Sequence, residues 1–175
     1  MGYKFIRLKN EDKRIFKQLA QESFQKGYED EFGKDEDMVL PEEDIDMSLN
    51  AEGAVSYVVL ESDEIIGGAI VNINSETNHN HLDILFVKNG VQSKGVGMYI
   101  WNEIETLYPD TKIWETYTPY FEKRNIHFYV NKCGFRVVEF FNPRHPAEWN
   151  RNENETGNIP NEPGQYFFGF QKVME

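Results

Sequence analysis

Hydrophobic and polar positions alternate in ways that predict the elements of the first half of the chain. Residues 3–8 alternate over a short span, which favours a strand. After Asn10, apolar residues recur at helical spacing, and Gly27 is the predicted end of that helix. Pro41 is expected to open a second, short helix. Residues 54–61 and 65–74 are expected to form a β-hairpin, in which Gly67 and Gly68 mark a bulge or a close approach of another group.

The second half of the chain divides in the same manner. Its expected elements are a strand at 81–87, a helix at 98–108, a strand at 112–117, a helix from Pro119 to about Lys132, and strands at 135–141 and 165–173. Residues 142–164 are polar, rich in Pro, Gly and Asn, and aperiodic, which predicts a long loop. In the strand at 81–87, strict alternation would place Asp83 on the same face as Leu85 and Val87.

This order of elements, β-α-α-β-β-β-α-β-α-β-β, has no internal repeat. An antiparallel meander followed by strand-helix-strand crossovers indicates a mixed α/β (α+β) fold. The chain has 175 residues, enough for one domain with a sizeable core, so residues 1–175 are expected to form a single domain.

The stretch after the strand at 81–87 has the features of an anion-binding loop, and it consists of Gln92, Ser93, Lys94, Gly95, Val96 and Gly97. At a junction of strand, glycine loop and helix, backbone N–H groups and the positive end of a helix dipole converge, which suits a phosphate or pyrophosphate. The two glycines let the backbone approach an anion closely and take φ > 0. The pattern GxxxxGK[ST] is absent, and GxGxxG would need a third glycine where Ile100 stands. The pattern Gln/Arg-x-x-Gly-x-Gly/Ala is present, five residues after Val87.

Residues 87–97, with the helix behind them, resemble the acetyl-CoA-binding loop of the GCN5-related N-acetyltransferases. The segment from Asn125 through Tyr129 to Gly134 and Phe135 resembles the later helix of that family, which ends in Gly-Phe. The resemblance implies a twisted mixed sheet of about seven strands flanked by about four helices. It also implies acetyl-CoA as cosubstrate, with the pyrophosphate on the 92–97 loop, Lys94 adding a charge-assisted contact, and the pantetheine arm paired with the backbone of Leu85, Phe86 and Val87.

The resemblance also implies a tyrosine that protonates the leaving thiolate, and Tyr129 is the matching residue. Four residues separate it from Gly134, where the family has three. One residue turns a helix by about 100°, so either the helix contains a bulge or Tyr129 points elsewhere. Counting back to the position of the family's asparagine reaches Glu122, and Asn125 lies one turn closer as a candidate cofactor contact.

Acylation of an amine also requires a proton acceptor. A lysine-like amine has a pKa of about 10.4, so forming its neutral state at pH 7 costs roughly 4–5 kcal/mol. Asp83 is the candidate base, acting through water because an ordinary aspartate is too acidic to be efficient. His81 has a suitable pKa, and Glu115 on the next strand is a further candidate. A solvated polar pair remains the alternative for His81 and Asp83.

The charge of the chain limits its partners. Thirty acidic and 18 basic residues give a formal charge of −12, which argues against a general nucleic-acid binder and against an anionic membrane surface. An acidic stretch spans residues 29–46, where the resemblance implies the walls of an acceptor site. This charge favours a cationic amine, while a solvated surface is the alternative. His145, Pro146 and Trp149 are candidates for the opposite wall.

The remaining features indicate location and assembly. Cys133 is the only cysteine, the N-terminus has no signal-peptide core, and no run is long enough to span a membrane, so a cytoplasmic protein is expected. The histidines lack metal-ligand spacing, so no metal is expected. The aromatic final strand suggests a homodimer.

The sequence therefore predicts an acetyl-CoA-dependent N-acetyltransferase that acts on a small cationic amine by direct attack. One alternative is an acyl-CoA-binding sensor of the same fold without catalysis. Another is an acetyltransferase for peptide N-termini or lysines. An unrelated phosphate-binding domain is a further, lesser alternative.

Overall fold

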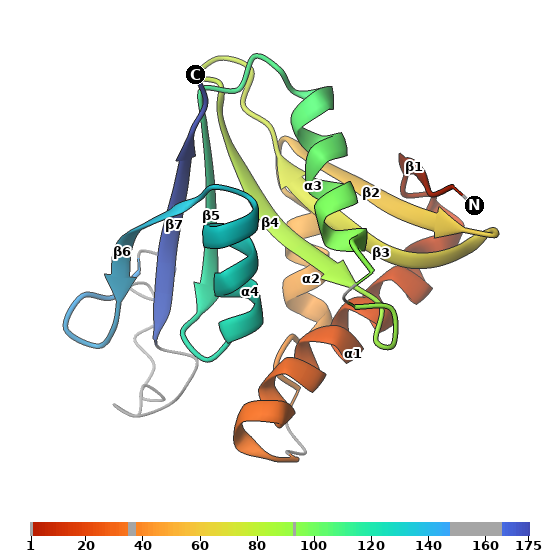
Figure 1. The fold of residues 1–175 in the computed structure, drawn as a ribbon, viewed down its shortest axis with the longest axis horizontal. Helices are drawn as coiled ribbons and strands as arrows, with labels where there is room; N and C mark the ends of the chain where they lie inside the picture. The colour runs from red at the N-terminus through yellow and green to blue at the C-terminus, as the bar shows by residue number, and fades with distance from the viewer. Residues whose placement is uncertain (1, 35–37, 93, 148–165) are drawn as a thin grey trace.

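A computed structural model describes residues 2–34, 38–92, 94–147 and 166–175 of the chain (Figure 1). Its elements, in chain order, are β1 (Lys4–Arg7), α1 (Lys13–Phe32), α2 (Glu42–Asn50), β2 (Ala54–Glu61), β3 (Glu64–Asn72), β4 (His79–Val87), α3 (Val96–Leu107), β5 (Ile113–Pro119), α4 (Lys123–His127), β6 (Arg136–Phe141) and β7 (Phe167–Val173). A 3₁₀ turn (Asn10–Asp12) precedes α1, and a π-helical turn (Phe128–Lys132) follows α4. The predicted order of helices and strands and the mixed α/β class are confirmed.

The seven strands form one sheet in the order β1-β2-β3-β4-β5-β7-β6. The pair β4–β5 is parallel, and the other neighbours in the sheet are antiparallel. The predicted hairpin is β2–β3, which turns through Ser62 and Asp63, both with positive φ. The parallel pair therefore joins two antiparallel halves, β1–β4 and β5–β7–β6.

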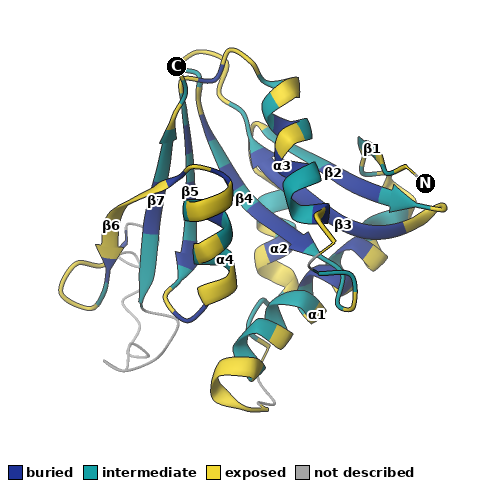
Figure 2. Ribbon diagram, in the orientation of Figure 1, coloured by how far each residue is buried: buried dark blue, intermediate teal, exposed yellow. Residues whose placement is uncertain are grey.

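Helices cover both faces of the sheet, and each face has its own core. On one face, Ile100, Trp101 and Ile104 of α3 pack with Tyr129 and with apolar strand residues. On the other face, α1 and α2 bury Phe16, Leu19, Ala20 and Ile45 against β2, β3 and β4. Figure 1 shows α3 and α4 in front of the sheet, with α2 behind it, and Figure 2 shows buried residues along the central strands.

The two central strands separate part of the way along their length. The register of β4 with β5 runs from His79–Ile113 to Leu82–Thr116 and ends there, although both strands continue. Figure 1 shows the strands diverging toward their C-terminal ends. Beyond Leu82, no strand of the described residues pairs with the edge of β4 that faces β5, so backbone groups along it are available to a ligand.

Two helix boundaries differ from the prediction. The helix α1 continues through Gly27 to Phe32 and ends at Gly33, whose φ is 85°. It continues because Tyr28 and Phe32 pack against Phe121, which lies far along the chain. Helix signals in the sequence around Gly27 cannot indicate a contact with a residue so far along the chain.

The predicted helix start at Pro119 is also wrong, because this residue is the last of β5 and pairs with Phe167. The next amide, that of Tyr120, donates to Tyr166 on the β7 side. Backbone groups alternate along a strand, so the nitrogen of Pro119 faces the gap that β4 has left. A proline is tolerated there because no ladder hydrogen bond is lost.

The alternation expected along β4 is interrupted at Asp83. Ile84 pairs with Ile70, but Leu82 pairs with Val71, so Asp83 is an extra, bulged residue. As a result Leu82 and Leu85 both reach the core under α3, whereas Ile84 reaches the core under α1. The prediction of strict alternation through residues 81–87 was therefore wrong.

The final strand lies inside the sheet. β7 is hydrogen-bonded to β5 on one side and to β6 on the other, and Phe170 is buried in the core. Exposed apolar side chains lie instead on β6, at Val137, Val138 and Phe140. The homodimer stays a prediction, and the aromatic final strand no longer supports it.

The two glycines of β3 allow helices to approach the sheet. A Cβ added at Gly68 would lie 2.6 Å from the Phe16 ring of α1 and 2.8 Å from the carbonyl oxygen of Tyr57. We expect Gly68→Ala to lower the free energy of unfolding by about 1–3 kcal/mol, because overpacking forces side chains from their preferred rotamers. Urea unfolding, with equal slopes for both proteins, measures the change.

Gly2→Ala is the control for this variant, since an added Cβ there meets nothing within 4 Å. Equal unfolding midpoints for the Gly68→Ala and Gly2→Ala proteins would contradict the packing argument.

Candidate functional site

The predicted anion-binding loop leads directly into α3. Gly95 is the residue before the helix and has φ of 80°, in the left-handed region that favours glycine. No side chain of the described residues caps the first turn of α3, so N–H groups at this helix end can bind an anion. The expectation of φ > 0 fails at Gly97, which is not among the glycines with positive φ. A Cβ there would lie 3.3 Å from the ring of Phe128, so this glycine gives room to that ring.

Gln92 braces the loop from within. Its side-chain amide donates to the carbonyl oxygen of Val87 at 3.2 Å and to Oδ1 of Asn89 at 3.0 Å. Its Oε1 accepts from the backbone amide of Gly90 at 2.9 Å. The side chain therefore ties the end of β4 to the loop and fixes the position of α3.

A cavity of about 570 Å³ lies at the C-terminal end of β4, with further walls from α1, α3 and the α4 region. Of the residues predicted to bind the cofactor, eight line it: Leu85, Phe86, Val87, Gln92, Gly95, Val96, Gly97 and Asn125. Lys94 is exposed and lies outside the lining. Ser93 lies outside the described residues. Residues that are distant in sequence thus meet in one cavity at the start of α3.

The cavity is also lined by residues that were not predicted. They are Ser23 and Phe24 of α1, Met98 of α3, and Glu122, Arg124, His127, Phe128 and Lys132 around α4. The basic side chains add positive charge beside the N-terminus of α3, which complements an anionic ligand. The sequence contained one indication of this basic helix face: Arg124 and His127 are three residues apart in a predicted helix and so lie on the same side of it.

Glu122 is a buried carboxylate in the wall of the cavity. Its exposure is 5%, and Oε1 has no hydrogen-bond partner among the described residues. Burial raises the pKa of this carboxyl to about 7, Arg124 lowers it, and Asp30 raises it further. The sequence pointed to position 122 only as the counterpart of a family asparagine, and nothing local in the sequence indicates its burial.

Tyr129 lies in the core, at the inner end of the opening between the strands. Its exposure is 5%, and its hydroxyl is hydrogen-bonded with Thr116, the last residue of β5 that pairs with β4. Burial raises the pKa of the phenol well above its ordinary value. The neighbouring Phe128, not Tyr129, lines the cavity. The π-helical turn is a bulge of the kind that was one of the two alternatives for the extra residue before Gly134.

Asp83 and His81 form a pair outside the cavity lining. Nδ1 of His81 lies 2.5 Å from Oδ1 of Asp83, and the His81 ring lies 5.0 Å from that of Tyr117. His81 pairs with Glu115 across β4 and β5, so their side chains share one face of the sheet. Glu115 itself accepts from Gln171 at 3.0 Å.

Many carboxylates of the predicted acidic wall have local partners. Glu42 and Asp46 both bind Lys17, at 2.7 and 3.0 Å. Asp30 binds Lys26, and Glu31 binds Lys123, at 2.9 and 3.0 Å. Residues 35–37 and Trp149 lie outside the described residues. His145 was proposed for the opposite wall. Its Nε2 lies 2.6 Å from Oε2 of Glu139 on β6, which is separated from β5 by β7.

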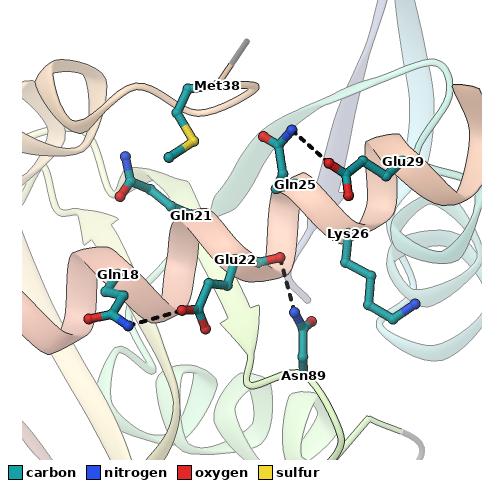
Figure 3. Close-up of a pocket in the computed structure, with 8 residues that line it drawn as sticks. All are labelled: Gln18, Gln21, Glu22, Gln25, Lys26, Glu29, Met38 and Asn89. Atoms are coloured by element: carbon teal, nitrogen blue, oxygen red, sulfur yellow. Dashed lines mark hydrogen bonds between the residues drawn. The ribbon is translucent and has the colours of Figure 1, made fainter. Parts of the chain in front are cut away.

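A second hollow, of about 470 Å³, lies along the outer side of α1 (Figure 3). Its lining is largely polar, and its side chains bond to one another or to the backbone. Gln18 donates to Glu22, Gln25 to Glu29, and Asn89 to the carbonyl oxygen of Glu22. These contacts brace α1 against the loop after β4, so we assign the hollow a structural role.

Two features are absent from the described part of the chain. No group of three or more His, Cys, Asp or Glu side chains is arranged to hold a metal ion. No described helix combines the length and apolar character needed to cross a membrane.

Comparisons with known proteins agree with this geometry. Residues 14–135 match the model of the acetyltransferase (GNAT) family. The chain is 45% identical over 168 residues to YrkN, an uncharacterised protein of Bacillus subtilis strain 168, with 95% of this chain and 91% of that protein covered.

Two solved structures have the same fold. One is the PaiA N-acetyltransferase of Thermoplasma acidophilum in complex with coenzyme A, with a TM-score of 0.67, 16% identity, and coverage of 99% of this chain and 100% of that one. The other is the spermidine N-acetyltransferase of Vibrio cholerae in complex with CoA and spermine, with a TM-score of 0.66, 13% identity, and coverage of 98% and 95%. The family match and the fold lead to one conclusion: this chain belongs to the GNAT acetyltransferase family.

Proposed function

We propose that the protein transfers an acetyl group from acetyl-CoA to a primary amine, by direct attack of the amine on the thioester. One observation carries the proposal: a single cavity joins the N-terminus of α3 to the end of β4, beyond the last residue of β4 that pairs with β5. This cavity offers both a site for an anion and backbone groups for an extended ligand.

The two ends of coenzyme A have matching partners in this cavity. The N–H groups of the first turn of α3, with Arg124 and Lys132, would hold the pyrophosphate. The backbone of Leu85, Phe86 and Val87 would pair with the amides of the pantetheine arm, as an added strand would. Asn125 lies in the same lining and is the proposed further contact.

The proposed reaction needs a proton acceptor and a proton donor. Tyr129 is the proposed donor to the departing thiolate, because its raised pKa keeps the phenol protonated and its hydroxyl lies where the strands part. For the acceptor, two carboxylates compete. Asp83 is held by His81, and Glu122 lies within the cavity.

The proposed acceptor is a small cationic amine, in the cytoplasm. The net charge of −12 and the spermidine specificity named for the Vibrio neighbour support this choice. A second candidate is an acyl-CoA sensor without turnover, which the position of Tyr129 outside the cavity lining favours. Turnover on a peptide N-terminus or lysine in place of a small amine would identify a peptide acetyltransferase.

Calorimetric titration tests the cofactor half of the proposal. The purified protein is titrated with acetyl-CoA, with ATP and NAD as controls for general phosphate binding. Micromolar or tighter binding of acetyl-CoA alone is the expected result. Preference for a nucleotide would refute the proposal, and binding of acetyl-CoA without turnover on any amine would support the sensor.

We expect Gly95→Asp to abolish acetyl-CoA binding. The new side chain places bulk and negative charge beside the pyrophosphate, at a position whose φ is already unfavourable for a side chain. Gly90→Asp is the matched control, because Gly90 has a φ of 93°, an added Cβ meets nothing within 4 Å, and the residue lies outside the cavity lining. Equal affinities of the two variants for acetyl-CoA, by calorimetry, would remove the loop from the binding site.

We expect Tyr129→Phe to reduce kcat by about 10²-fold while the Kd for acetyl-CoA changes little. A lost general acid lowers the rate of the chemical step, and a thiolate is a good leaving group, so the low end of the usual range applies. Steady-state kinetics and calorimetry supply the two numbers. The control is Tyr99→Phe, whose hydroxyl bonds only to the carbonyl oxygen of Tyr3 among the described residues. Unchanged kcat in Tyr129→Phe would exclude Tyr129 as the donor.

A further inference from the structure

The carboxylate of Glu122 occupies a space that a glycine of another helix leaves free. A Cβ added at Gly27 of α1 would lie 2.5 Å from Oε1 and 2.7 Å from Oε2 of Glu122. The Glu122 side chain therefore reaches across to α1, whose Ser23 and Phe24 line the same cavity. Further along α1, the ring of Phe32 packs on that of Phe121, the residue before Glu122, so the two segments are in contact there as well.

Glu122 does not serve an evident structural purpose in this position. It directly precedes α4, yet its side chain makes no capping hydrogen bond to that helix. No salt bridge to a described residue satisfies it, and Oε1 is buried without a partner. Burying a carboxylate without a partner is costly, so its placement in a ligand cavity indicates that a ligand group completes it.

We propose that Glu122 is the general base of the acetyl transfer and takes the proton from the ammonium group of the acceptor. This inference rests on the proposed acetyltransferase function. It names a residue of the cavity wall, rather than Asp83 on β4, as the group that makes the amine nucleophilic.

This assignment accounts for every proton that moves in the reaction. An acceptor R–NH₃⁺ gives one proton to the Glu122 carboxylate and becomes R–NH₂. The nitrogen lone pair then forms the bond to the thioester carbonyl carbon, and the C–S bond breaks. The Tyr129 hydroxyl gives its proton to the departing thiolate of CoA. As the amide forms, the nitrogen loses a second proton, and this proton restores the Tyr129 hydroxyl. Glu122 finally releases its proton to solvent, and the products are the acetamide, CoA–SH and one proton.

The surroundings of Glu122 suit a base that acts near neutral pH. A carboxyl with a pKa of about 7 is half ionised there and accepts a proton far more readily than an ordinary carboxylate. The charged groups around it are Asp30 of α1, Arg124 beside it on α4, and His127 and Lys132 along the same cavity. Lys123, on the same helix as Arg124, is engaged with Glu31.

The proposed acid and base are also electrostatically linked. Burial is the main cause that raises the pKa of Tyr129, and the charge of Glu122 adds to it. Glu122 lies in the cavity wall, and Tyr129 lies in the core next to Phe128, which lines the same cavity.

The test compares Glu122→Gln with the wild type on an amine panel that includes spermidine, an aminoglycoside and a lysine-containing peptide. In the wild type, kcat/KM is expected to fall below about pH 7 as the base becomes protonated. Glu122→Gln should lower kcat by about 10²- to 10⁴-fold and remove this fall. Glu76→Gln, an exposed loop residue, is the matched control and should leave the profile unchanged.

Three outcomes would overturn the inference. Wild-type turnover on no amine would refute the proposed function and this inference with it. Turnover that Glu122→Gln retains, while Asp83→Asn loses it, would leave the function in place and move the base to Asp83. A rise in KM with the same kcat and the same pH profile would make Glu122 a binding group for the cation.

Gly27→Ala supplies a second variant that leaves the Glu122 side chain intact. The added methyl would displace the carboxylate, and a flexible side chain can yield without unfolding the helix. We expect a loss of kcat in the same direction as in Glu122→Gln, with acetyl-CoA affinity retained. Full activity of Gly27→Ala would show that the position of the carboxylate against α1 is immaterial and would overturn the inference.

Thermal unfolding gives a readout that is independent of activity. The carboxyl has a pKa of about 7 in the native state against an ordinary value of 4.5. The native state therefore holds more protons than the unfolded state between these pH values and loses stability as the pH rises through them. Glu122→Gln should therefore gain melting temperature over the wild type above pH 7, and the gain should shrink toward pH 4.5. A pH-independent difference would show that the carboxyl is not perturbed and would overturn the inference.

Discussion

The separation of β4 from β5 is the constraint on which the rest of this structure depends. Four residue pairs, from His79–Ile113 to Leu82–Thr116, hold together two antiparallel halves of the sheet. Past this point no described strand pairs with the edge of β4 that faces β5, and the backbone groups along it must be satisfied by something else. The end of α1, the start of α3 and α4 surround the opening, so a ligand with amide groups can complete the sheet there.

The order of elements was predictable because each depends on local patterns of hydrophobic residues and on turn residues. The glycine loop was predictable for the same reason: Gly95 and the helix behind it are consecutive in the chain. The boundaries that failed all depend on distant contacts. Helix α1 passes Gly27 because of Phe121, and Pro119 stays in β5 because β4 has departed. The bulge at Asp83 likewise follows from pairing with β3, which no single strand reveals.

The candidate site residues show the same difference between local patterns, which the sequence reveals, and distant contacts, which it does not. The residues of the loop and of β4 that line the cavity were found from sequence, because their spacing within one segment carries the information. The contribution of α4 could be predicted only in part. The extra residue of this helix indicated a bulge. The π-helical turn, however, forms only where the helix packs on the sheet, and so the sequence did not show that Phe128 lines the cavity in place of Tyr129. The burial of Glu122 depends on Gly27 and has no local signal.

The overall charge of the chain is a poor guide to what the cavity recognises. Lysines 17, 26 and 123 hold several of the surface carboxylates of α1 and α2. Exposed pairs of this kind act in a high effective dielectric and are screened by salt. Among the described residues of the lining, Glu122 is the one acidic group. A charge interaction is about four times stronger at an effective dielectric of 20, as in a partly buried site, than in water. The buried carboxylate of Glu122 therefore has more influence on a bound cation than the acidic surface around it.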